Sequence, residues 1–193
     1  MIIKSGVGNG YSAKVTDNNQ LEVVSESKTL QHWRSINKGL VFQVIGDKAT
    51  LSAATIPILH IQNTSAEKRL VITYIRLQQV GCSAAGIDST THYFQTGFGR
   101  TYSSGGTAVT PVIVNRSSAN VAEATCYDNN PTLAGTFQEI DRYYPSKASD
   151  AVVYNKEGSI ILGLNDTFEC RIVSADTQGD VYARVTMMFI ENE

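Results

Sequence analysis

Charged residues are scarce in this chain of 193 residues. Asp, Glu, Lys and Arg make up 18% of the sequence, against about 25% in an average soluble protein. The formal net charge is −2, so the chain has no strong field of one sign that would attract nucleic acid or an anionic membrane. We therefore expect neither nucleic acid nor membrane among its partners.

Cysteine is also scarce. The three cysteines, Cys82, Cys126 and Cys170, are an odd number and show no CxxC spacing. Disulfide frameworks belong to small secreted chains that lack a sufficient core, whereas 42% of this chain is hydrophobic. We expect free, buried thiols and a chain that is made in a reducing cytoplasm.

Long apolar runs are missing as well. No stretch approaches the ~20 apolar residues that cross a bilayer. The N-terminal MIIKSGVGNG has neither the apolar segment nor the cleavage pattern of a signal peptide. The sequence therefore predicts no membrane span and no secretion signal.

The motifs of common enzyme classes are absent too. There is no G-x-S-x-G elbow, no GxGxxG after a strand, no Walker loop and no HExxH. His32, His60 and His92 are far apart in the sequence, with no second type of metal ligand beside them. His60 alternates with Ile58 on an apolar segment, where a hydrogen-bonded core or interface histidine is commoner than a ligand. We predict no catalytic residue, no cofactor and no metal site, and hence no enzyme.

What the sequence does contain is strand patterning. From about Gly39, short segments rich in β-branched and aromatic residues alternate with turn residues. The predicted strands are 39–46, 55–63, 69–80, 110–115, 121–126, 137–144, 151–155, 159–164, 167–174 and 181–190. No segment of about twelve residues or more keeps a helical period. This spacing predicts an all-β protein with an antiparallel β-sandwich and helix limited to short turns.

Alternation is clearest toward the C-terminus. Within 167–174 and again within 181–190, apolar residues alternate with polar ones. This pattern predicts an antiparallel sheet with one face in the core and one face in water. Asn165 and Asp166 connect 159–164 to the first of these strands and predict a tight hairpin.

Residues 1–38 differ from the remainder. Three glycines make the first ten residues flexible, and two short alternating segments then flank an Asn-rich turn, which predicts a β-hairpin. Because so small a hairpin needs a packing partner, it packs either on its own sandwich or on a neighbouring chain. We therefore divide the chain into an arm with a hairpin, 1–38, and a sandwich domain, 39–193. The candidate partner contacts of the arm are Tyr11, Val15, Leu21 and Val23.

Residues 81–110 form a stretch rich in Gly, Ser and Thr that also contains aromatic residues. Long loops are uncommon in compact domains and are often functional. We predict a single loop that covers one end of the sandwich or contacts a neighbour. The aromatic rings of this loop have three possible roles: they pack within the chain, stack on sugars or anchor a protein interface. The candidate partner contacts here are Tyr93, Phe94, Phe98 and Tyr102. Together with the small hairpin, this loop predicts self-association.

Two stretches resemble small virion proteins of tailed phages. In GNGYSAKVTDNNQLEVVSES, a Gly-rich start leads into an aromatic-x-Ala-Lys-Val, an Asn-rich turn and a Leu-x-Val strand. In SSGGTAVTPVIVNRSSAN, Gly-Gly-Thr precedes Thr-Pro-Val, and an Asn precedes a Ser pair. The two stretches cover about a fifth of the chain, and the predicted all-β remainder is compatible with them.

The resemblance implies a jelly-roll-like component of the virion. The chain is short for a major shell subunit and lacks that protein's long helix, so the resemblance points to a capsid decoration (cement) protein. Such proteins clamp shell subunits and commonly act as homotrimers, with the major capsid protein or other virion proteins as partners. The alternative is a fibre or receptor-binding domain that recognises host surface carbohydrate. A polysaccharide-cleaving enzyme would need paired carboxylates in a cleft, which the sequence does not reveal.

Overall fold

The computed structural model describes residues 2–4, 12–15, 21–22, 30–48, 51–52, 54–80, 92–145, 151–174 and 179–191. The chain divides into two compact units, Met1–Leu30 and Gln31–Glu193, whereas the sequence pattern predicted a boundary after residue 38. The first unit contains β1 (Ile2–Lys4), β2 (Ser12–Val15) and β3 (Leu21–Glu22). These strands form an antiparallel sheet in the order β1-β2-β3.

The second unit begins with a short helical segment. Helix α1 (Leu30–Trp33) continues as a single π-helical turn, η1 (Arg34–Lys38). Gly39 ends it in the left-handed conformation, at φ 58°, which an L side chain seldom adopts. In the part of the chain that the structure describes, these two turns are the only helix. The prediction that helix is limited to short turns is confirmed.

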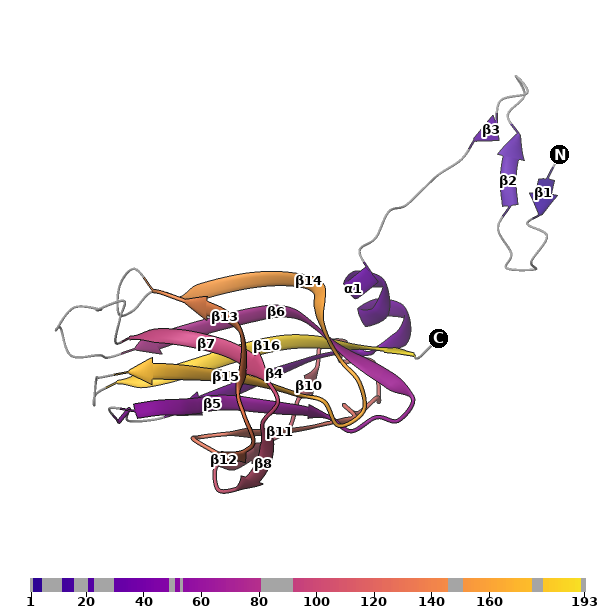
Figure 1. The fold of residues 1–193 in the computed structure, drawn as a ribbon. Helices are drawn as coiled ribbons and strands as arrows, with labels where there is room; N and C mark the ends of the chain where they lie inside the picture. The colour runs from indigo at the N-terminus through magenta and orange to yellow at the C-terminus, as the bar shows by residue number, and fades with distance from the viewer. Residues whose placement is uncertain are drawn as a thin grey trace. The chain divides into compact units, whose positions relative to one another are not determined.

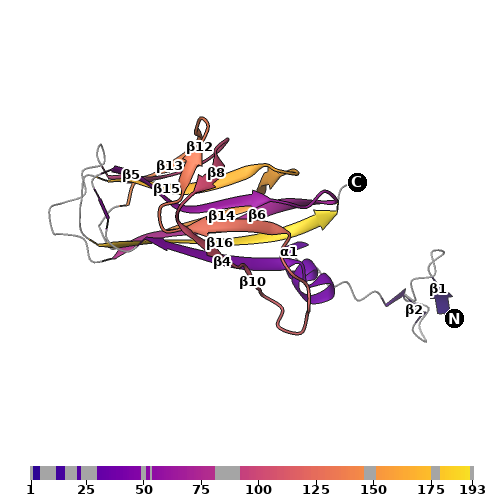
Figure 2. The same ribbon diagram turned by 90° about the horizontal axis from the view of Figure 1, so that it is seen from below.

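The remaining elements are strands, and their pairings are antiparallel. They are β4 (Val41–Lys48), β5 (Ala54–Asn63), β6 (Lys68–Val80), β7 (Tyr93–Phe98), β8 (Thr101–Ser104), β9 (Thr107–Val109), β10 (Val112–Ile113), β11 (Ala124–Asp128), β12 (Thr132–Ala134), β13 (Gln138–Tyr143), β14 (Val152–Leu162), β15 (Thr167–Ser174) and β16 (Asp180–Glu191). A five-stranded sheet has the order β10-β4-β16-β6-β14, and a six-stranded sheet has the order β13-β7-β15-β5-β11-β9. The two sheets pack as a sandwich (Figures 1 and 2), so the predicted fold class is confirmed.

Eight strands of the sandwich pair in a nested order. β4 pairs with β16, β5 with β15, β6 with β14, and β7 with β13. Successive strands from β4 to β7, and again from β13 to β16, alternate between the two sheets. The chain between β7 and β13, which we call the insertion because it lies between the two nested sets of strands, contributes the remaining strands. Its strands β9 and β11 extend the six-stranded sheet, β10 extends the five-stranded sheet, and β8 pairs with β12 outside both sheets (Figure 1).

The core lies between the two sheets. Its largest fully buried side chains include four phenylalanines, Phe42, Phe94, Phe168 and Phe189. The rings of Phe42 and Phe189 pack edge to face at 5.7 Å between centroids. In β16 the predicted alternation holds from Val181 to Val185, but Thr186 and Met188, which were expected to face water, are buried as well as Met187 and Phe189. Burial of a large apolar side chain stabilises the fold by about 1.5–3 kcal/mol, so this interface holds the sandwich together.

The predicted hairpin across Asn165 and Asp166 is wrong. β14 belongs to the five-stranded sheet and β15 to the six-stranded sheet, so the turn joins opposite layers of the sandwich. Asn165 does adopt the left-handed conformation, at φ 64°. Its turn chemistry therefore reverses the chain, but turn chemistry does not determine which strand becomes the hydrogen-bonding neighbour.

Three further predictions need correction. The segments 151–155 and 159–164 are one strand, β14, whose pairing with β6 is irregular between Asn155 and Ile160. The stretch 81–110 is not one loop, because β7, β8 and β9 lie within it; residues 81–91 lie outside the described part. The outer face of β15 is not simply in water, since Glu169 is 1% exposed.

Candidate functional site

The arm residues proposed as partner contacts are only partly described. Val15 and Leu21 are opposite each other on β2 and β3, so the fold brings these two positions together. Tyr11 and Val23 lie outside the described residues.

The four aromatic residues predicted to contact a partner do not gather at one place. Phe94 is fully buried between the sheets and is a core residue. Phe98 is partly buried, and its ring packs against Phe168. Tyr93 packs beside the ring of Tyr144, with 5.7 Å between centroids. Tyr102 of β8 stacks on Tyr127 of β11, with the ring centroids 3.6 Å apart. The four rings therefore lie in different parts of the sandwich, whereas the sequence analysis expected them in a single loop.

The outer face of the six-stranded sheet satisfies its own charges. Arg171 donates a hydrogen bond from Nε to Oε1 of Gln95 at 2.8 Å, and the amide of Gln95 donates to Glu139. Arg142 donates twice to Glu139, each time at 2.8 Å. Hydrogen bonds from Arg142 are the main reason that the pKa of Glu139 is lowered. Arg171 also lies over the Phe137 ring, 3.3 Å from its centroid. Because these groups satisfy one another, this part of the face offers few free charges to a ligand.

The same face is covered where the insertion crosses it. Arg100 donates to Glu169 Oε1 at 3.3 Å and to the Leu133 carbonyl at 3.0 Å. Nε2 of His60 lies 3.0 Å from the Arg100 carbonyl oxygen. Burial lowers the pKa of His60 and raises the pKa of Glu169. The interpretation of His60 as a hydrogen-bonded, buried histidine is confirmed.

The outer face of the five-stranded sheet is different, because two arginines meet on it. Arg76 of β6 is directly opposite Arg184 of β16. Ile45 of β4 is opposite Arg184 on its other side, and Val153 of β14 is opposite Arg76. Ile45 and Val153 are 54% and 52% exposed, so apolar surface lies on both sides of the arginine pair.

Two tyrosines and a hollow complete this surface. In the neighbouring rows lie Tyr182, which is exposed, and Tyr74, which is half-buried. A shallow hollow of about 310 Å³ is lined by Gln31, Gln43, Tyr74, Val114, Asn155, Arg184 and Thr186. We call this surface the arginine face and define it by Ile45, Tyr74, Arg76, Val153, Tyr182 and Arg184.

No carboxylate of the described residues forms an ion pair with Arg76 or Arg184. Arg76 donates to Oε1 of Gln78 at 2.8 Å. Asp47 is diagonal to Arg184, but it interacts with Asp128, which accepts a hydrogen bond from the Asp47 backbone N–H at 3.3 Å. Burial, with a contribution from the Asp47 carboxyl, raises the pKa of Asp128. The arginine face therefore carries two adjacent like charges that form no ion pair with a carboxylate of the described part of the chain.

Potential metal ligands are not grouped in the described residues. Within these ranges no cluster of three His, Cys, Asp or Glu side chains could hold a metal ion. Cys126 and Cys170 are free and buried, and burial raises the pKa of the Cys126 thiol to about 12, which keeps it in the unreactive thiol form. No helix in the described segments has both the length and the apolar character to cross a membrane.

Comparison of the sequence with protein-family models gives no match, and comparison with curated proteins gives none either.

Proposed function

We propose that this chain is a structural virion protein of a tailed phage, and more specifically a capsid decoration (cement) protein that binds and stabilises the shell. The observation that carries the proposal is the nested pairing of β4 to β7 with β16 to β13. This order supports a jelly roll, the two-sheet arrangement of two Greek keys that occurs in viral capsid domains. The resemblance of residues 8–27 and 103–120 to phage virion proteins supports the same assignment.

The arginine face is the surface that we assign to the shell. Like charges directly opposite each other on a sheet cost about 0.2–1 kcal/mol, and Arg76 and Arg184 keep this arrangement in the free protein. Carboxylates on a shell subunit would neutralise both charges and accept hydrogen bonds in a defined geometry. Ile45 and Val153 would lose their contact with water in the same step. The surface therefore suits an acidic partner with some apolar area.

Self-association and the N-terminal unit complete the proposal. We assign a homotrimer, because a symmetric oligomer repeats a weak contact and raises its overall strength. Met1–Leu30 is a separate compact unit with few strand residues, so it suits a tether that gains stability from a neighbouring surface. The protein would be made in the host cytoplasm and would act on the virion.

The experiment is a co-sedimentation assay with shells of the same phage that lack this protein. The wild-type chain should sediment with the shells at a fixed ratio. Arg184→Glu should lose most of this binding, because it places a carboxylate against an acidic partner. Arg69→Glu is the matched control, since Arg69 is exposed on the same strand as Arg76 and lies about 20 Å from it along the strand.

The assay separates the function from the contact surface. If the wild-type chain does not sediment with the shells, the decoration function is wrong. If the wild type binds and Arg184→Glu binds equally well, the shell contact lies elsewhere. Equal losses in both arginine variants would indicate a general effect of charge and would remove the assignment of the arginine face.

A fibre or receptor-binding domain that recognises host carbohydrate is the second candidate function. Jelly rolls occur in lectin domains as well as in capsids, and a polar pocket at the β14–β15 turn favours this candidate. Binding to host cells without binding to shells would support the second function over the first.

A further inference from the structure

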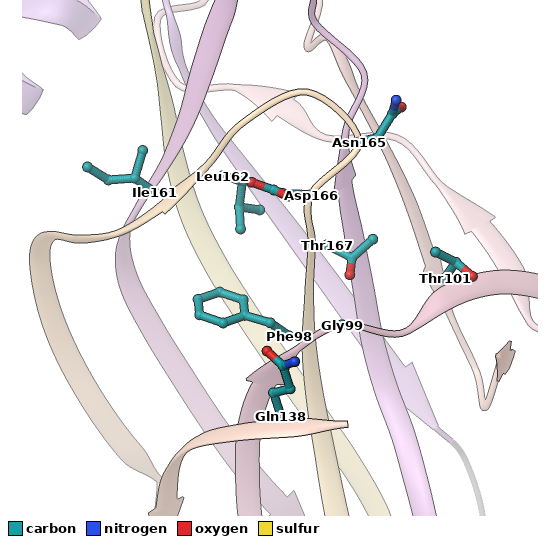
Figure 3. A pocket seen from close by; sticks show the side chains of 9 residues that line it. All are labelled: Phe98, Gly99, Thr101, Gln138, Ile161, Leu162, Asn165, Asp166 and Thr167. Carbon is teal, nitrogen blue, oxygen red and sulfur yellow. The ribbon is translucent and has the colours of Figure 1, made fainter. Parts of the chain in front are cut away.

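A pocket opens between the turn that joins β14 to β15 and the corner that joins β7 to β8. Its volume is about 330 Å³, at the small end of the range of ligand pockets. The lining residues are Phe98, Gly99, Thr101, Gln138, Ile161, Leu162, Asn165, Asp166 and Thr167 (Figure 3). Because three separate segments of the chain supply these residues, the pocket depends on the assembled sandwich.

The wall formed by the β14–β15 turn is held rigidly. The fully buried Asn63 donates from Nδ2 to the carbonyl oxygens of Leu162 at 3.0 Å and Lys68 at 2.9 Å. The backbone of Asn63 also exchanges hydrogen bonds with Asn165 and Asp166, at 2.8 and 3.1 Å. Asp166 Oδ2 in turn accepts the Gly163 N–H at 2.8 Å. A ligand would therefore meet a preformed wall and would not have to order this turn.

The opposite wall is equally constrained. Gly99 has φ +87°, and a Cβ on it would lie 2.8 Å from the Thr136 carbonyl oxygen. Phe98 packs its ring edge to face against Phe168 of the core, at 6.3 Å between centroids. In Figure 3 the ring of Phe98 lies between the Leu162 side chain and the Gln138 amide. The pocket thus has an apolar floor that the core holds in place.

The polar groups at the rim select the chemistry of the ligand. Gln138 and Asn165 are exposed carboxamides, which both donate and accept hydrogen bonds. Thr101 and Thr167 contribute hydroxyls, and Asp166 contributes a carboxylate. The lining contains no Lys, Arg or His, so the Asp166 carboxylate disfavours an anionic ligand, and a single carboxylate is too few for a metal ion.

We infer that this pocket binds a neutral saccharide, as one sugar unit or as the end of a glycan. A sugar ring carries adjacent hydroxyls that donate and accept, which matches the carboxamides, the hydroxyls and the carboxylate. Its C–H face is apolar and matches the ring of Phe98. The inference does not depend on shell binding and holds for either proposed function.

The test is a titration of the ¹⁵N-labelled full chain with glucose, galactose, mannose and N-acetylglucosamine at millimolar concentrations. At least one sugar should give saturable shifts confined to the Asn165–Thr167 backbone and to the side-chain amides of Gln138 and Asn165. Gln138→Ala should weaken this binding by up to about tenfold, the effect of one lost hydrogen bond. Thr101→Ala should weaken it too, whereas Ser103→Ala, which removes an exposed hydroxyl two residues along β8, should not.

The charge of the pocket gives an independent readout. Glucuronate should bind more weakly than glucose, because its carboxylate is repelled by the carboxylate of Asp166. Asp166→Asn should reduce the difference in affinity between these two sugars. The inference is overturned if every sugar leaves these signals unshifted, since all hexoses share the required chemistry. It is also overturned if the shifts do not saturate, if they spread over the surface, or if Gln138→Ala leaves the affinity unchanged. Sugar binding without shell binding would keep this inference and remove only the decoration function.

Discussion

His60 and Glu169 are directly opposite each other on β5 and β15, and both side chains are buried on the outer face of the six-stranded sheet. Within the described part of the chain, Nδ1 of His60 and Oε2 of Glu169 have no hydrogen-bond partner. Buried groups in this situation favour their neutral forms, because burial penalises charge. The two residues therefore respond to acid with opposite effects on stability.

The first prediction concerns His60 and pH. Burial lowers its folded-state pKa below the ordinary value of 6.5, so on acidification the unfolded chain takes up a proton first. The stability that His60 contributes is present above pH 6.5 and is lost as the pH falls toward the folded pKa. We expect His60→Gln to flatten this loss below pH 6.5, measured as the melting temperature across pH. If His60→Gln keeps the wild-type dependence on pH, the pKa of His60 is not lowered in the folded protein.

Glu169 should behave in the opposite way. Burial raises its folded-state pKa above the ordinary 4.5, so the folded chain is protonated first. Acidification therefore adds stability through Glu169 as the pH falls through the folded pKa toward 4.5. Glu169→Gln should remove this gain and make the acid-induced loss of stability steeper than in the wild type. A profile flatter than that of the wild type would show that the Glu169 pKa is not raised.

Asn63 is predicted to be a key residue for stability. Its side chain donates to two carbonyl oxygens and accepts the Ser65 N–H at 3.0 Å. Asn63→Ala should lower the free energy of unfolding by about 3 kcal/mol, the sum of three hydrogen bonds, as measured by urea denaturation. Asn165→Gly is the control and should cost little, because glycine accepts the left-handed conformation at φ 64°. A loss below about 1 kcal/mol in Asn63→Ala would contradict this role.

Local patterns predicted most of the strands but not the sites. Alternation within 181–190 is a property of neighbouring residues, so the sequence alone could assign Val181 to the core and Arg184 to the surface. The meeting of Arg76 with Arg184 depends on β16 lying beside β6, which is a consequence of the nested order. The sequence indicated a turn at Asn165 for the same local reason, but it did not indicate that this turn joins strands of two different sheets.

The sugar pocket was missed for a related reason. Phe98 was predicted as an aromatic contact, and Asp166 was predicted as a turn residue. Gln138 carried no signal, because an exposed glutamine in a strand is ordinary. These residues converge only when the β7–β8 corner, the start of β13 and the β14–β15 turn meet at one end of the sandwich. No periodicity within a segment contains that information.

The arginine pair should destabilise the free protein. Arg184→Thr removes one of two like charges and introduces a residue that favours strands, so we expect a gain of about 0.2–1 kcal/mol in the free energy of unfolding at low ionic strength. The gain should shrink in concentrated salt, which screens exposed charges. Arg69→Thr should show no comparable dependence on salt. If Arg184→Thr lowers stability equally at all salt concentrations, the two guanidinium groups do not repel each other.

The last prediction tests the N-terminal unit as a tether. A truncated chain that begins at Leu30 keeps α1 and the whole sandwich, because Gln31–Glu193 is a compact unit of its own. We expect this protein to melt at the wild-type temperature and to sediment at three times the mass of its chain, like the full-length protein. It should nevertheless lose most of its binding to shells, since the repeated tethers no longer add to the affinity. In the full chain, Leu21→Asp should weaken shell binding in the same direction, because β3 would then present a charge where an apolar contact is expected.

Normal shell binding by the truncated protein would show that the tether is not needed. Unfolding of the truncated protein would show that the first unit stabilises the sandwich instead. A monomer at high concentration, in either protein, would contradict the proposed trimer, because nothing would then repeat the weak contact on which a tether depends.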